Sequence, residues 1–196
     1  MIPRHFQITL ALLLLAILIS GTYLVRLKRR EEAFNRQSIP TRPVAPGEMG
    51  KQEHIRVLVA YDDDLALRWR EAQVFLPSER TARAKQVLRA VLAQYLQSPS
   101  PHTVGKGADI KEVYLLSNDT LVVDTTAQFA AGQPSGILLE ELTLTSLIET
   151  LTANVPGIAR VKFLVDGQER ETLAGHVDLM PFYETSAVHE LVKEFE

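Results

Sequence analysis

The longest apolar run of the chain lies near its start. Residues 8–25 contain no charged side chain, and fourteen of these 18 residues are apolar. A helix of this length spans about 27 Å, which is close to the hydrocarbon thickness of a bilayer. The run ends in the basic stretch RLKRR at residues 26–30, where a cleaved signal peptide would carry small residues. We therefore predict a short flank over residues 1–7 and an uncleaved transmembrane signal anchor over residues 8–25; a cleaved signal peptide and a buried core helix are the alternatives.

A segment without apolar periodicity follows the predicted anchor. Residues 26–53 begin with a basic collar and continue into a stretch that contains Pro40, Pro43 and Pro46. Proline lacks a backbone N–H and favours extended chain, so this segment is predicted to be a tether. The basic collar, taken alone, places the following domain in the cytoplasm under the positive-inside rule.

Regular patterns of apolar and polar residues return at residue 54. Alternation and short apolar runs predict strands over residues 54–61, 67–76, 110–116, 121–125 and 161–165, with a short return strand over 171–173. Apolar residues three and four apart predict two helices, one capped by Ser78 and ending near residue 96, the other over residues 137–153. Short turns between neighbouring strands predict antiparallel hairpins. The predicted fold class is α+β: a two-layer mixed, largely antiparallel sheet of five or six strands with two helices packed on it, plus the N-terminal transmembrane helix.

Composition divides the chain into two parts. Residues 1–50 carry seven Lys or Arg against three Asp or Glu, whereas residues 51–196 carry fourteen against twenty-one. An acidic domain disfavours nucleic-acid binding, which requires a basic surface. The chain has no cysteine, which excludes disulfides, thiolate metal sites and a lipid-modified cysteine anchor.

One stretch of the domain is similar to a known family. Residues 146–179, SLIETLTANVPGIARVKFLVDGQERETLAGHVDL, resemble the GerMN domain, the sporulation and spore-germination family named after the GerM protein. The features that match are TLT at 150–152, VPGI at 155–158, VKFLVDG at 161–167 and AGHVDL at 174–179; upstream, DTLVVDTTAQF at 119–129 also matches. The resemblance covers residues 54–181. Residues 182–196 are predicted to be an acidic tail with a solvated helix over 186–195.

The resemblance implies a small α/β module displayed outside the cytoplasmic membrane, with no established enzymatic activity and no catalytic residues to transfer. In this chain, which lacks the lipoprotein cysteine, the helix over residues 8–25 would serve as the anchor. The family placement and the basic collar thus disagree on topology. We expect a single-pass protein of the cytoplasmic membrane with an extracytoplasmic domain.

Two groups of side chains are candidates for function. His176 and Asp178 lie two residues apart, so a strand would place them on one side, where a carboxylate can orient an imidazole for acid–base work. Trp69, flanked by Arg68 and Arg70, could form an aromatic and basic patch for a partner. Structural roles are the alternatives: a turn or cap for the first group, and a core tryptophan with arginines outside for the second.

Other motifs are incomplete. HELVK at residues 189–193 has Lys193 where a zinc-binding helix needs its second histidine. The run Asp62 to Asp64 lacks the glycine and glutamate of a calcium loop, and GKG at 105–107 lacks a third glycine. We therefore predict no cofactor and no metal, a solvated turn at residues 62–64, and a surface turn at 105–107.

These observations favour a non-catalytic, membrane-anchored module that binds or scaffolds a cell-envelope component, either a protein or peptidoglycan. One alternative is an envelope hydrolase that uses His176 and Asp178. Another is a structural domain that assembles with copies of itself at the membrane, for which an unpaired sheet edge would be evidence.

Overall fold

The computed structural model describes residues 50–195. No helix within this range is long and apolar enough to cross a membrane. The predicted anchor at residues 8–25, its flank, and the tether up to residue 49 lie outside the described residues.

The domain begins with an antiparallel hairpin. Strand β1 (Lys51–Tyr61) pairs with strand β2 (Ala66–Leu76) along its whole length. The predicted alternation is confirmed in β1, where Ile55, Val57 and Val59 are buried. Leu58 and Ala60 point to the other side of the strand and are buried too, so the middle of β1 is enclosed on both faces.

The first long helix, α2 (Arg80–Leu96), follows this hairpin. The cap is Glu79 and not the predicted Ser78: its carboxylate accepts the backbone N–H groups of Thr81 and Ala82 at 2.9 and 2.6 Å. Glu79 lies one residue closer to α2 than Ser78, so its carboxylate oxygens reach the backbone N–H groups of the first turn, which have no acceptor within the helix. The buried residues of α2 follow the predicted spacings of three and four: Ala84, Val87, Leu88, Val91, Leu92 and Tyr95. Leu96, which the same spacing places on this stripe, is exposed.

The second sheet has four strands in the order β3-β4-β5-β6. Strands β3 (Ile110–Ser117) and β4 (Thr120–Thr125) form the predicted hairpin, and β5 (Arg160–Val165) lies parallel to β4. Strand β6 (Tyr183–Glu184) pairs antiparallel with β5. The apolar residues Leu121, Val123, Val161 and Phe163 of the two central strands are buried.

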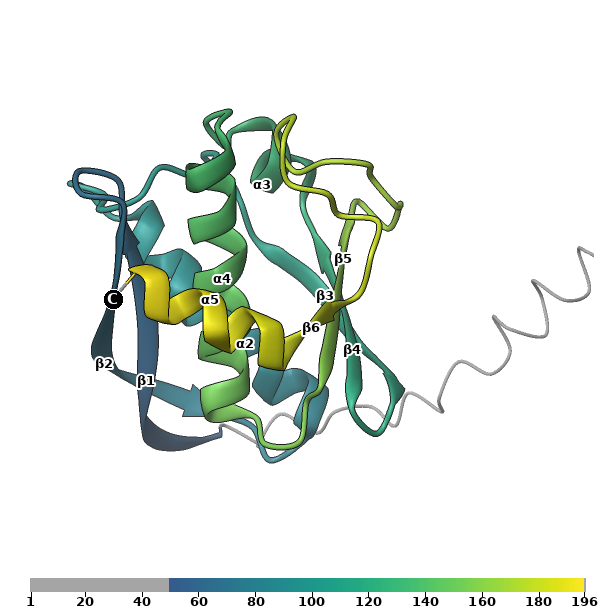
Figure 1. Ribbon diagram of the computed structural model, residues 1–196. Coiled ribbons are helices and arrows are strands. Elements are labelled where there is room, and N and C mark those ends of the chain that lie inside the picture. Colours follow the sequence, from purple (N-terminus) through teal and green to yellow (C-terminus); the bar gives the residue numbers. More distant parts are fainter. Residues whose placement is uncertain (1–49, 196) are drawn as a thin grey trace, which may run out of the picture. The chain divides into compact units, whose positions relative to one another are not determined.

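Helix α4 (Ile137–Asn154) occupies the centre of the domain. It runs between the two sheets, with α2 packed on one side and α5 (Thr185–Phe195) crossing it on the other (Figure 1). A short helix, α3 (Ala127–Ala131), buries Phe129 and precedes α4. Because α4 has neighbours on several sides, it buries polar residues such as Thr143, Ser146 and Thr150 in addition to its leucines.

The structure confirms the predicted α+β class, but the prediction of a single sheet is wrong. The six strands form two separate sheets, and four helices, α2 to α5, stand where the sequence predicts two packed helices and a solvated one at the end of the chain. The physical reason lies at the outer edge of β1, where helix side chains take the place of a neighbouring strand. Thr150 Oγ1 accepts the N–H of Leu58 at 2.7 Å, and Tyr95 Oη accepts the N–H of Ala60 at 3.0 Å.

The end of the chain also differs from expectation. The helix expected as a solvated tail is α5, which packs on α4 and buries Val188 and Val192. Residues 171–173 form no strand; single bridges join Val165 to Gln168 and Thr172 to Asp178. Asp166 and Gly167 form a tight turn directly after β5, in which both residues have positive φ, 51° and 74°.

Candidate functional site

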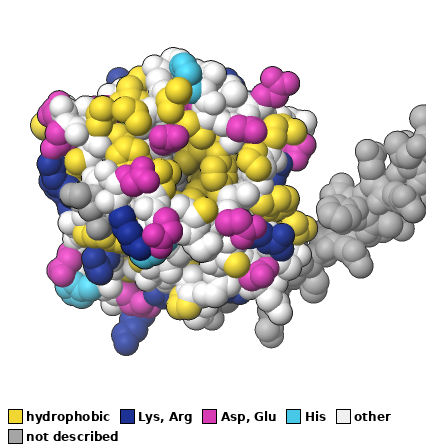
Figure 2. All heavy atoms as spheres, viewed as in Figure 1, with side chains coloured by type: hydrophobic (Ala, Val, Ile, Leu, Met, Phe, Trp, Pro, Cys, Tyr) yellow, Lys and Arg dark blue, Asp and Glu magenta, His cyan; other side chains and the backbone are white. Residues whose placement is uncertain are grey.

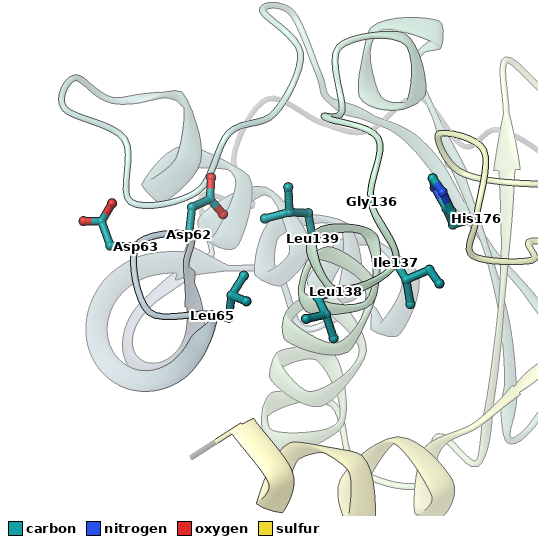
Figure 3. Close-up of a pocket in the computed structure, with 8 residues that line it drawn as sticks. All are labelled: Asp62, Asp63, Leu65, Gly136, Ile137, Leu138, Leu139 and His176. Carbon is teal, nitrogen blue, oxygen red and sulfur yellow. The ribbon is translucent and has the colours of Figure 1, made fainter.

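A shallow, open pocket of about 640 Å³ lies where three separate segments meet. The β1–β2 turn contributes Asp62, Asp63 and Leu65, and the start of α4 contributes residues 136–139. His176, in the loop after β5, closes the far side (Figure 3). The exposed fractions of Leu65, Ile137 and Leu138 are 37, 57 and 43 %, so the pocket offers apolar side chains next to two carboxylates.

This pocket opens on a face where hydrophobic side chains gather around α4, with acidic side chains among them (Figure 2). Isolated exposed apolar residues are common on protein surfaces, but a group that lines a hollow is typical of an interaction site.

Glu140 holds the His176 side of the pocket in place. Its carboxylate is fully buried and accepts the backbone N–H groups of Ala174, His176 and Val177 at 3.0, 3.1 and 2.9 Å. The N–H of Gly136 also donates to it, at 3.2 Å. Burial alone would raise the pKa of Glu140, but these donors and the His176 ring outweigh it and lower the pKa to about 2. Glu140 is therefore an ionised anchor between α4 and the loop over residues 174–177.

The structure does not bring His176 and Asp178 together as a pair. His176 Nδ1 lies 3.0 Å from Glu140 Oε1 and 3.3 Å from Ser135 Oγ. Asp178 Oδ1 instead accepts the N–H of Met180 at 2.8 Å, which makes a local turn. Ser135 and Glu140 share one ring nitrogen of His176, whereas a relay from carboxylate to hydroxyl needs both nitrogens. This arrangement does not activate Ser135.

A second histidine, His102, does have a carboxylate at one ring nitrogen and a hydroxyl at the other. Asp62 Oδ1 is 2.5 Å from His102 Nδ1, and His102 Nε2 is 2.6 Å from Thr143 Oγ1. The order of groups is that of a catalytic triad. However, His102 and Thr143 are both fully buried, and neither lines the pocket. A substrate cannot reach the Thr143 hydroxyl, so the three groups form an internal connection between β1, the loop after α2, and α4.

Burial lowers the pKa of His102, while the neighbouring Asp62 opposes this shift. The imidazole is thus neutral near pH 7 and stacks edge-on against Tyr95, with ring centroids 4.8 Å apart. The sequence does not indicate that His102 and Thr143 belong together, because partners about 40 residues apart leave no local pattern. The one available signal was a histidine between Pro101 and the next polar residues of a loop, which is too common to be informative.

The second predicted group has a mainly structural environment. Trp69 is half-buried against the core, and the guanidinium carbon of Arg56 lies 4.4 Å from its ring centre. Arg68 and Arg70 are exposed and stack on Tyr61, at 4.6 and 5.4 Å. Arg68 also forms an ion pair with Asp64. The three side chains therefore do not form one continuous patch over Trp69.

The incomplete motifs have other roles in the structure. His189 Nδ1 lies 2.8 Å from Glu149 Oε1 and joins α5 to α4. The predicted surface turn at residues 105–107 is confirmed: Lys106 and Gly107 are exposed, and the N–H of Ala108 donates to the carbonyl oxygen of Gly105 at 2.8 Å. Gly105 itself is buried, because its Cα packs against the backbone of α3 and Gly132. Within residues 50–195, no three His, Asp or Glu side chains are placed to hold a metal ion together.

A family model matches most of the described domain. The family model described as Sporulation and spore germination, named Germane, matches residues 60–171. Among solved structures, the crystal structure of a "Putative Lipoprotein" from Clostridium perfringens is 15 % identical, with a TM-score of 0.43; the alignment covers 73 % of this chain and 93 % of that one.

The tandem GerMN domains of the sporulation protein GerM from Bacillus subtilis are 16 % identical, with a TM-score of 0.48. That alignment covers 67 % of this chain and 45 % of the other. No curated protein matches the chain.

Proposed function

The chain belongs to the Germane family of sporulation and spore germination proteins, with a GerMN-type domain, and we propose that it is a membrane-anchored, extracytoplasmic binding module. In this proposal residues 8–25 anchor the chain in the cytoplasmic membrane. The domain binds another protein of the cell envelope and catalyses no reaction.

The pocket at the start of α4 is the observation that carries this proposal. Leu65, Ile137 and Leu138 are large apolar side chains that remain exposed although the domain has a well-packed core. Asp63 is exposed beside them, and Asp62 is held at the rim by His102 and by the N–H of Thr103. Charge complementarity therefore favours a partner segment in which an apolar side chain lies next to Lys or Arg.

The chemistry of the described groups supports binding over catalysis. The hydroxyl that a histidine could activate, Thr143, is buried, and the hydroxyl near exposed His176 shares a ring nitrogen with Glu140. A hydrolase that uses His176 and Asp178 would require the two side chains to act together, and Asp178 is bonded within its own turn.

The topology of the anchor needs its own experiment, because the basic collar after residue 25 favours the opposite orientation. We expect a C-terminal alkaline phosphatase fusion to be active and a C-terminal reporter that works only in the cytoplasm to be inactive. Activity of the cytoplasmic reporter alone would contradict the extracytoplasmic placement.

Binding through the pocket is tested by site-specific photo-crosslinking in the full-length chain. A photoreactive amino acid replaces Leu138 in the pocket or, as the control, Leu116 at the tip region of the β3–β4 hairpin, which is exposed to 66 %. We expect one defined protein adduct from position 138 and none of the same mass from position 116. Adducts that are identical from both positions, or an adduct at 138 that is removed by a peptidoglycan hydrolase, would contradict binding of a protein in the pocket.

A further inference from the structure

Three consecutive large apolar residues are exposed at the end of strand β3. Tyr114, Leu115 and Leu116 have exposed fractions of 51, 40 and 66 %, and none of them belongs to the core. A regular strand with one covered face exposes only every second residue. Here the register with β4 shifts between Leu115 and Ser117, so Leu116 is paired with no residue of β4. An exposed apolar run of this kind is typical of a functional contact. We call residues 114–118 the hairpin tip.

The hairpin tip lies at the end of the domain that is opposite to the pocket. Arg80 donates to the carbonyl oxygen of Asn118 at 2.5 Å and to that of Pro156, two residues after α4, at 2.7 Å. The tip is therefore next to the last turn of α4, whereas the pocket is at the first turn. Because α4 has 18 residues, it is about 27 Å long. The β1–β2 turn and the β3–β4 turn accordingly lie at opposite ends of the domain (Figure 1).

The chain enters the domain at the same end as the hairpin tip. Lys51 pairs with Leu76, and helix α2 begins at Arg80, only four residues further along. In a chain that is anchored through residues 8–25, the 24 residues from 26 to 49 link the anchor to this end of the domain. A flexible chain of that length has a mean end-to-end distance of about 25–30 Å, so the tether keeps the tip near the bilayer.

The charges around the hairpin tip do not oppose contact with lipid headgroups. The two carboxylates nearest to the tip along the chain lie against cations: Glu112 Oε2 is 3.1 Å from Lys85 Nζ, and Asp119 Oδ1 is 3.9 Å from Arg160 Nη2. Arg80 adds a positive charge beside the tip and donates to carbonyl oxygens, which carry no net charge. The pocket, in contrast, is lined by two aspartates. An anionic membrane surface therefore attracts the tip end of the domain more than the pocket end.

We propose that the hairpin tip contacts the lipid surface of the membrane in which the chain is anchored. Leu115 and Leu116 enter the boundary between headgroups and acyl chains, and the Tyr114 ring lies at headgroup level, where tyrosine is favoured. The position of the tip, beside the end where the tether enters, favours lipid over a protein partner. The contact depends on the membrane anchor of the proposed function, because three side chains suffice only where a tether already holds them close.

Such a contact orients the domain on the membrane. With the tip at the bilayer, the start of α4 points away from the lipid, and the pocket is held off by up to about 27 Å, the length of the helix. The pocket is then accessible to another protein of the envelope.

The absence of cysteine from the chain allows a single fluorophore to be attached to the full-length protein in vesicles of phosphatidylcholine and phosphatidylglycerol. A polarity-sensitive fluorophore is placed at N118C in the turn or, as the control, at L138C in the pocket; both positions are exposed. Lipid that carries a nitroxide quenches only a fluorophore close to it, so we expect quenching at position 118 and none at 138. Equal quenching at the two positions would overturn the proposal, as would a blue-shifted emission at 118 without quenching, which indicates a protein on the tip.

A substitution in the hairpin tip tests whether its apolar side chains make the contact. In the N118C chain, L116D places a charge at the tip, and L138D places the same charge in the pocket; both leucines are exposed. We expect L116D to lose most of the quenching at position 118 with an unchanged thermal midpoint, and L138D to retain it. Equal quenching in the two variants would contradict a contact through Leu116.

An alkaline carbonate wash separates the contact of the tip from the anchor on which it depends. A chain that stays in the vesicles after the wash, but shows no quenching at position 118, would overturn the contact and leave the anchor intact. A chain that the wash removes would contradict the anchor and the contact together. The pocket is tested separately, by photo-crosslinking from position 138.

Discussion

Asp62 Oδ1 and His102 Nδ1 lie 2.5 Å apart although the residues are 40 positions apart in sequence. The second carboxylate oxygen of Asp62 accepts the N–H of Thr103 at 2.9 Å, so a single side chain joins the β1–β2 turn to the loop between α2 and β3. The same turn forms one wall of the pocket. This internal connection therefore positions the pocket, and the predicted solvated turn at residues 62–64 is in part a structural contact.

We predict that His102 makes the domain sensitive to mild acid. Because burial lowers the pKa of His102 below 6.5, the unfolded chain takes up the proton first as the pH falls. The stabilisation is complete above pH 6.5 and decreases below it. The variant H102N should be less stable than wild type at pH 7 by about 1–3 kcal/mol and should lose this part of the pH dependence. Unfolding curves at several pH values measure both effects, with H54N, at an exposed histidine, as the control; an unchanged pH profile in H102N would contradict the assignment.

Glu140 is expected to stabilise the domain over a more acidic range. Its pKa is lowered from 4.5 to about 2, which corresponds to about 3 kcal/mol, present above pH 4.5 and lost as the pH falls toward 2. The variant E140Q should lose about this amount at pH 7, because Gln offers one weaker acceptor to several N–H donors. Its stability should also change less between pH 4.5 and 2. E141Q, at the neighbouring half-exposed residue, is the control; equal losses in the two variants would argue against a buried anchor.

A substitution at Thr150 tests why the strands form two sheets and not one, which we attribute to helix side chains bonding the outer edge of β1. The Thr150 hydroxyl accepts the N–H of Leu58 at the outer edge of β1, the edge away from β2, and no strand within residues 50–195 pairs with that edge. T150V keeps the shape of the side chain and leaves a buried N–H without an acceptor, so we expect a loss of about 1–3 kcal/mol. Denaturant unfolding measures this. T152V, whose hydroxyl donates only to a carbonyl of its own helix, should change stability much less, and a reversed order would contradict the capping of β1.

Gly105 should not tolerate a side chain. A Cβ atom there would lie 1.8 Å from the carbonyl oxygen of Gln128 and 3.0 Å from the Cα of Gly132. Both neighbours are backbone atoms, so G105A must displace α3, at a cost of about 3 kcal/mol. K106A, at the exposed next residue, should stay within about 0.5 kcal/mol of wild type. Similar thermal midpoints for the two variants would show that the loop relaxes freely.

The sequence predicts well those elements that depend on neighbours along the chain. The β1–β2 and β3–β4 hairpins follow from alternation and short turns, and the stripe on α2 follows from spacings of three and four. The arrangement of the sheets does not follow, because the outer edge of β1 is satisfied by Tyr95 and Thr150, which are distant in sequence. A helix rich in threonine gave no indication that its hydroxyls would replace a strand.

The candidate site, likewise, could not be predicted as a whole from the sequence. Its residues come from positions 62, 63 and 65, 136–139 and 176, and no pattern in the sequence relates these segments. His176 was predicted for its chemistry and does line the pocket, but its partner is Glu140, 36 residues away, and not Asp178. Local alternation suggested the wrong partner because the segment around His176 is a loop held by a buried carboxylate, not a strand.

The most direct test of the account is capture of the envelope partner by full-length chains with and without an additional acidic residue at position 138 of the pocket. L138D adds a charge to an exposed apolar position, and L116D adds the same charge at an exposed leucine on the β3–β4 hairpin. We predict that wild type and L116D capture the same protein, and that L138D loses it while its thermal midpoint is unchanged. Full capture by L138D, or equal loss in both variants, would contradict binding through the pocket at the start of α4.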